Sequence, residues 1–177
     1  MRFLTTLFET FDDAARAIRA LKAICIAEAD ISFVTRCIKG AFSASSQAGK
    51  IKGKNEGEQL QDLHAGVGVM NIPGIGPAAV AGKIARQIAD TEKRDGAETC
   101  LVSVLMTHGL EEREANIHAE CIRQGDTLLV VRMDDDRQQD IETTCSLFSR
   151  VDIERRFTVF AASGWFRFDI KPASPAC

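Results

Sequence analysis

The chain has 177 residues, of which 45% are apolar and 27% are charged, so it can form one globular domain with a hydrophobic core. Its formal net charge is −3, so the chain does not have the strong excess of basic residues that is typical of a protein that binds nucleic acid. Acidic residues follow the N-terminus too closely for a secretory signal, and no apolar run reaches the roughly 18 residues of a membrane-spanning helix. We therefore expect a single cytoplasmic domain over residues 1–177.

Residues 3–36 predict a strand–helix–strand unit. Residues 3–8 are mostly β-branched and aromatic, which favours a strand. Thr10 and the two aspartates that follow it suit the start of a helix, in which apolar residues recur at helical spacing to about residue 24. Residues 31–34 then have the apolar pattern of a second strand.

The same order of elements returns near the C-terminus. Residues 127–133 predict a strand, three aspartates favour the start of a helix over about 137–148, and residues 151–156 predict another strand. Two such units form the ferredoxin-like split β-α-β fold, an antiparallel four-stranded sheet with helices on one face. We therefore expect an α+β core made of residues 1–36 and 111–170. A parallel doubly wound sheet is the alternative, but the middle of the chain offers little strand to continue it.

Residues 37–110 are predicted to be a largely helical insertion between the second and third strands. Its first part, about residues 38–62, is rich in Gly, Ser and Lys, which favours a flexible polar loop. Helical patterns follow over residues 77–92 and about 98–107. The insertion therefore interrupts the core without adding to its sheet.

A glycine-rich turn within residues 69–83 is the candidate ligand site. Gly74 and Gly76, with the alanine three residues later, fit the loop that binds dinucleotide phosphates, and Asn71 precedes them. That loop needs a further strand that ends in an acid, and the residues around Asp95 do not predict a strand. A small-ligand or nucleotide-binding turn is therefore one interpretation of this segment.

The same small residues support two other interpretations. They allow two helices to approach closely, which favours self-association as a homodimer or another homo-oligomer. Pro73, Pro77 and the scarcity of leucine make burial in lipid weak, so peripheral membrane contact is a minor alternative.

The sequence predicts no catalytic residue, metal site or cofactor. Its six cysteines contain no C-x-x-C pair, and its three histidines are not at ligand spacing with them. We interpret the cysteines as buried apolar residues and His118 as a half-buried packing residue. Near the C-terminus, Trp165, Phe166 and Phe168 predict either a tail packed over the sheet or an exposed binding patch.

Four stretches of the chain resemble the general stress protein 17M-like (YflT-type) family, whose members are called heat-induced stress proteins. They are the opening strand–DDA–helix–DISFV unit, NIPGIGPAAVAG, GLEEREANIHAECIRQGDTLLVVRMDD and SGWFRFD, in the order of the family. The resemblance implies an α/β sandwich interrupted by a Gly- and Ala-rich segment, no established catalytic residues, and an association with stress. We therefore predict a non-enzymatic bacterial stress-associated protein that self-associates through its insertion.

Overall fold

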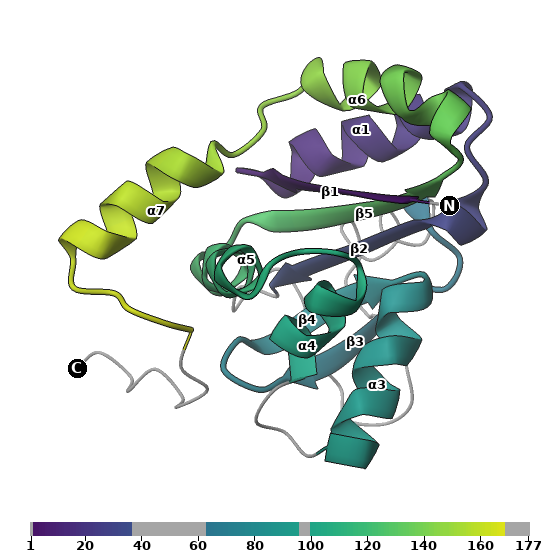
Figure 1. The fold of residues 1–177 in the computed structure, drawn as a ribbon. Helices are drawn as coiled ribbons and strands as arrows, with labels where there is room; N and C mark the ends of the chain where they lie inside the picture. Colours follow the sequence, from purple (N-terminus) through teal and green to yellow (C-terminus); the bar gives the residue numbers. More distant parts are fainter. Residues whose placement is uncertain (1, 37–62, 96–99, 169–177) are drawn as a thin grey trace.

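The computed structural model of the chain describes residues 2–36, 63–95 and 100–168, which form a mixed α+β structure on one antiparallel sheet (Figure 1). The predicted flexible loop over residues 38–62 lies outside the described residues. The strands are β1 (Arg2–Phe8), β2 (Ile31–Arg36), β3 (Gly68–Ile72), β4 (Gly76–Ala81) and β5 (Thr127–Met133). The helices are α1 (Phe11–Ala23), α3 (Lys83–Asp95), α4 (Cys100–Thr107), α5 (Glu112–Gln124), α6 (Gln138–Ser146) and α7 (Ile153–Ala162), with the short 3₁₀ helices η1 (Glu28–Asp30) and η3 (Asp135–Arg137). None of the helices in these ranges is long and apolar enough to cross a membrane.

The sheet has the strand order β1-β5-β2-β4-β3, and every strand runs antiparallel to its neighbours. β5 lies between β1 and β2 and pairs with both along most of its length. β1 and β2 are therefore parallel to each other, joined by α1, with β5 inserted between them. The predicted strand–helix–strand unit and the predicted strand over residues 127–133 are confirmed, and they share one sheet.

The predicted fourth strand, residues 151–156, is wrong, because most of it belongs to α7. Asp152 precedes the helix, and its carboxylate accepts a hydrogen bond from the backbone N–H of Arg155 at 3.1 Å. Phe157 and Phe160 follow at helical spacing and pack on the hydrophobic core. The helical period appears only when the residues after the predicted strand are included.

A single β-bridge lies beside β1, where a ferredoxin-like sheet would have its fourth strand. Arg150 pairs antiparallel with Phe8, and the N–H of Val151 donates to the carbonyl oxygen of Leu7 at 2.8 Å. This bridge covers only one end of β1. Within the described ranges, the other end of β1 has no strand neighbour except β5.

The glycine- and alanine-rich segment forms the β3–β4 hairpin, so the predicted helix from residue 77 is wrong in its first part. Pro73 and Gly74 are the central residues of a tight turn, in which the N–H of Ile75 donates to the carbonyl of Ile72 at 3.0 Å. Gly74 has a φ of +79°, as a type II turn requires at this place. β4 then pairs with β2. The described sheet therefore has five strands and not four, and the insertion contributes strands as well as helices.

The sheet is buried on both faces, whereas helices were expected on one face only. Leu128 and Val130 of β5 belong to a hydrophobic cluster that includes residues of α3, α4, α5 and α7. Leu129 and Val131, which alternate with them, belong to a second cluster with α1 and α6. Burial on both faces explains the continuous apolar run of β5, because neither side of the strand faces water.

Two of the three aromatic residues near the C-terminus pack on α5. Trp165 donates its indole N–H to the carboxylate of Glu120 at 3.2 Å, and the backbone N–H of Phe168 donates to the side-chain oxygen of Asn116 at 3.3 Å. Phe168 is 7% exposed, whereas Phe166 is 95% exposed. Two of the three aromatic residues therefore fasten this segment to α5, and the third faces solvent.

Candidate functional site

A pocket of about 340 Å³ lies beside β1, and we call it the histidine pocket. Strand β1, the loop between α4 and α5, α5 itself and the start of α7 all contribute to it. Its lining consists of Phe3, Thr5, His108, Gly109, Leu110, Glu114, His118, Ile153 and Glu154.

Local structure directs these side chains to one place. Phe3 and Thr5 alternate along β1 with residues that face α1, so they lie on the face of the sheet that α5 covers. Glu114 and His118 are four residues apart on α5, which places them one above the other on the helix. The bridge at Phe8 covers only the far end of β1. Within the described ranges, the end that carries Phe3 and Thr5 has no strand on its outer side, and the pocket lies there.

His108 is held by two neighbours and keeps one nitrogen without a partner. Its ring meets the ring of Phe3 edge to face, with the centroids 4.4 Å apart. Its Nε2 lies 2.7 Å from Oε1 of Gln87, an atom that can only accept, so the proton is on Nε2. The Nδ1 lone pair is buried and has no hydrogen-bond partner among the described residues.

His118 carries its proton on the other nitrogen. Its Nδ1 donates to the backbone carbonyl of Glu114 at 2.8 Å, so the lone pair is on Nε2. Burial lowers the pKa of both His108 and His118 below the ordinary value of 6.5, and for His118 this outweighs the opposing effect of Glu114. Both imidazoles are therefore neutral at pH 7, and each presents a hydrogen-bond acceptor.

The remaining polar groups of the pocket are a hydroxyl and two carboxylates. The Thr5 hydroxyl is buried and, in the described part of the chain, has no hydrogen-bond partner. Glu114 and Glu154 are exposed at the rim. No lining residue described here is a lysine or an arginine. The pocket is therefore rich in hydrogen-bond acceptors and has no positive charge at pH 7.

The histidines do not form a metal centre with their neighbours. Within residues 2–36, 63–95 and 100–168, no group of three or more His, Cys, Asp or Glu side chains is placed to hold a metal ion. Two imidazoles with lone pairs beside a hydroxyl suit an organic ligand that donates hydrogen bonds.

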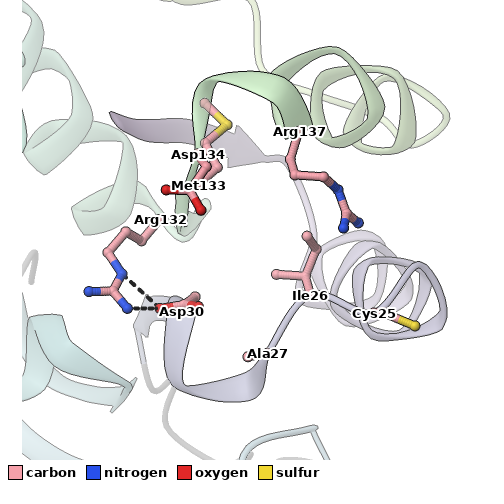
Figure 2. Close-up of a pocket in the computed structure, with 8 residues that line it drawn as sticks. All are labelled: Cys25, Ile26, Ala27, Asp30, Arg132, Met133, Asp134 and Arg137. Carbon is pink, nitrogen blue, oxygen red and sulfur yellow. Dashed lines mark hydrogen bonds and ion pairs between the residues drawn. The ribbon is translucent and has the colours of Figure 1, made fainter. Parts of the chain in front are cut away.

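A second pocket, of about 210 Å³, lies where β5 ends, beside the segment between α1 and β2 (Figure 2). Asp30 accepts a hydrogen bond from Nε of Arg132 at 2.7 Å and lies 3.7 Å from the Lys83 ammonium. Arg137 donates a hydrogen bond to the backbone carbonyl of Ile24 at 2.6 Å and so caps the C-terminus of α1. The lining contains two arginines and two aspartates, so it favours neither sign of charge. The histidine pocket is the stronger candidate.

Cys25 lies at the edge of this second pocket in a strained backbone conformation. Its φ of +64° is in the left-handed region, which a residue with a side chain seldom adopts. The N–H of Cys25 donates to Lys22 and that of Ile26 to Leu21, both at 3.0 Å, which is the hydrogen-bond pattern of a Schellman motif. Glycine is the usual residue at this place.

The residues predicted to bind a ligand lie elsewhere. Asn71 is exposed on β3, and Gly74 and Gly76 lie in and after the hairpin turn; none of them lines either pocket. The turn is followed by a strand and not by the helix of a phosphate-binding loop. The sequence analysis did not predict any residue of the histidine pocket as a ligand-binding residue, and it interpreted His118 as a packing residue. The one local signal for them is the four-residue spacing of Glu114 and His118.

Comparison of the chain with protein-family models, with curated proteins and with solved structures gave no match. The functional assignment therefore depends on the geometry of the pocket itself.

Proposed function

We propose that this protein is a non-enzymatic, small-ligand-binding α+β protein, and that the histidine pocket is its binding site. The observation that carries the proposal is the pair of unpartnered polar atoms, Nδ1 of His108 and Oγ1 of Thr5, beside one pocket. A buried polar group without a partner costs about 1–3 kcal/mol of stability. A ligand that hydrogen-bonds to both atoms would recover this free energy on binding.

A binding role fits the lining better than a catalytic one. Thr5 and His108 are not hydrogen-bonded to each other, so they do not form a nucleophile–base pair. No serine or cysteine is among the described lining residues. The polar groups therefore act as recognition points around an apolar wall, the usual composition of a small-molecule site.

The substitution Thr5→Val tests the proposal, because valine has the shape of threonine without the hydroxyl. We expect the variant to be about 1 kcal/mol more stable in urea unfolding, since an unpartnered hydroxyl is removed. We also expect NMR titrations with a fragment library to show weaker binding at the pocket amides than in the wild type. Thr143→Val, at an exposed site on α6 outside the pocket lining, is the matched control and should change neither property. A wild-type protein whose pocket amides respond to no fragment at millimolar concentration would exclude this function.

Self-association remains a proposal, with a new location suggested by the fold. β3 is at the edge of the sheet and, within the described ranges, pairs only with β4. An edge strand can pair with the same strand of a second copy through its free backbone groups. The exposed Asn71 lies on this edge, so Asn71→Lys should lower the molar mass measured by light scattering. Leu147→Lys, at the exposed residue that follows α6, should not. Equal masses for the wild type and Asn71→Lys would contradict a β3 interface.

The other predictions from the sequence have no specific support in the geometry. Nucleotide binding at Gly74 and Gly76, peripheral membrane contact, a cytoplasmic location and the association with stress all stay predictions. We further propose that the core is a ferredoxin-like sheet whose fourth strand is reduced to the bridge between Phe8 and Arg150, and whose open edge beyond β2 is extended by the β3–β4 hairpin.

A further inference from the structure

We propose that the ligand of the histidine pocket is a small organic cation with an apolar body and at least two N–H donors, such as a primary ammonium. The inference rests on the proposed function and names the class of ligand that this pocket would take. It follows from three properties of the lining, which are the charge at its rim, the hydrogen-bonding character of its interior and its apolar walls.

The charge at the rim favours a cation. Glu114 and Glu154 bring two carboxylates from two different helices, and neither forms an ion pair within the described part of the chain. The two histidines are neutral at pH 7, so no positive charge in the lining offsets these carboxylates. A negatively charged ligand would meet only repulsion here, whereas a positively charged one would be attracted.

The interior of the pocket favours a ligand that donates hydrogen bonds. His108 is 8% exposed and His118 is 6% exposed, so each is more than nine-tenths buried. Each ring has already used its N–H, on Gln87 and on the Glu114 carbonyl, and has only a lone pair left. A ligand that can only accept would leave both lone pairs unpartnered, while an ammonium has three donors to offer them.

The apolar walls of the pocket favour a ligand whose remaining part is apolar. Phe3, Leu110 and Ile153 contribute apolar surface from the strand, the loop and α7. Phe3 is 37% exposed, which is unusual for a large aromatic residue and leaves part of its ring for a ligand. The ligand therefore combines a donor-bearing charged end with a compact apolar body.

Four cyclohexyl compounds have the same apolar body but differ in charge and in hydrogen-bond donors, so their affinities test these two properties of the ligand separately. They are cyclohexylamine, cyclohexanol, cyclohexanecarboxylate and N,N,N-trimethylcyclohexylammonium, each titrated into the full-length chain by calorimetry at pH 7.5 and low salt. We expect the primary amine to bind about fivefold more tightly than the alcohol, since one exposed ion pair contributes up to about 1 kcal/mol. The quaternary ammonium, which has charge but no donor, should bind more weakly than the amine, and the carboxylate should bind least.

Substitutions at the rim locate the effect. Glu114→Gln and Glu154→Gln should each weaken the binding of cyclohexylamine by about two- to fivefold and leave that of cyclohexanol unchanged. Glu142→Gln on α6, on the opposite face of the sheet, is the matched control and should change neither.

The outcomes distinguish this inference from the proposed function. Tighter binding of the alcohol or the carboxylate in the pocket would overturn the cation assignment and leave a small-ligand site in place. Equal binding of the primary amine and the quaternary ammonium would overturn the role of the histidine lone pairs. Binding of none of the four, together with a fragment library that leaves the pocket amides unchanged, would overturn both.

Discussion

The hydroxyl of Ser32 accepts a hydrogen bond from the backbone N–H of Lys83 at 3.1 Å, across 51 residues of sequence. Ser32 lies on β2 and Lys83 is the first residue of α3, so a strand supplies the N-terminal cap of a helix in the insertion. Gly82, between β4 and α3, makes this possible because it lies directly against β2. A Cβ at Gly82 would be 2.4 Å from the carbonyl oxygen of Ile31 and 2.8 Å from Cα of Ser32.

Gly82→Ala is therefore expected to destabilise the fold strongly. The clash is with backbone atoms that cannot move aside, and the φ of +79° disfavours any side chain. We expect a loss of about 2–4 kcal/mol in the free energy of unfolding, measured by urea denaturation. Gly68→Ala is the control, because a Cβ there would meet no atom within 4 Å, and its effect should stay within about 1 kcal/mol. Similar losses for both variants would show that Gly82 is not in close contact with β2.

Cys25→Gly should stabilise the protein. Glycine removes the cost of the left-handed backbone at this position, which is about 1–2 kcal/mol for a residue with a side chain, and adds a smaller entropic cost in the unfolded chain. The expected net gain is about 0.5–1 kcal/mol in thermal or urea unfolding. Cys25→Ala keeps the strain and should give no gain. An equal stability of the two variants would contradict the strained conformation of Cys25.

The described cysteines should differ sharply in their reaction with a thiol reagent. Burial raises the pKa of the Cys121 thiol to about 12 and that of Cys145 to about 11, and both side chains are fully buried. Cys25 is exposed. Alkylation of the native protein at pH 8, followed by peptide mass spectrometry, should label Cys25 within minutes and leave Cys121 and Cys145 unlabelled until urea is added. Equal labelling of Cys25 and Cys121 in the native state would be inconsistent with this core.

The two histidines of the pocket should make stability depend on pH. Their pKa in the folded state is below 6.5, the ordinary value, so the unfolded chain binds protons first as the pH falls. Their contribution is fully present above pH 6.5 and is lost as the pH falls through the folded pKa. We expect His118→Gln to lose less stability than the wild type between pH 7.5 and pH 5.5, measured by urea unfolding at each pH. A larger loss in the variant would contradict a neutral, buried His118.

The sequence alone predicted the elements whose local pattern agrees with their final packing. Thr10 caps α1 through a hydrogen bond from the Asp13 N–H at 3.2 Å, as its residue type indicates. β5 was found because a threonine and two valines stand within a mostly apolar run of seven residues. The β3–β4 hairpin was missed because alanine and glycine have low strand propensity, and it is the pairing of β4 with β2 that makes them a strand.

The candidate site was not predictable in the same way. Thr5, His108 and His118 are far apart in the sequence and are brought together by β1, the loop after α4 and α5. They are recognised as a site because Oγ1 of Thr5 and Nδ1 of His108 are buried without hydrogen-bond partners among the described residues. This property depends on the folded surroundings, and no residue pattern in the sequence encodes it. The prediction of a ligand turn at Gly74 used a glycine pattern that also fits a hairpin, and the residues on both sides of it decide between the two.

A long-range ¹H–¹⁵N NMR spectrum of the histidine side chains tests the central claim most directly, because the three histidines of the chain are all in the described residues. At pH 7.5 the spectrum should show His108 neutral with its proton on Nε2 and His118 neutral with its proton on Nδ1. On addition of cyclohexylamine, the signals of the unprotonated nitrogens of these two rings should shift. His64 accepts from the Gly66 N–H at 3.0 Å and lies outside the pocket, so its signals should stay in place. Signals of His108 and His118 that do not move, or a shift of His64 as large as theirs, would contradict the assignment of the histidine pocket as the binding site.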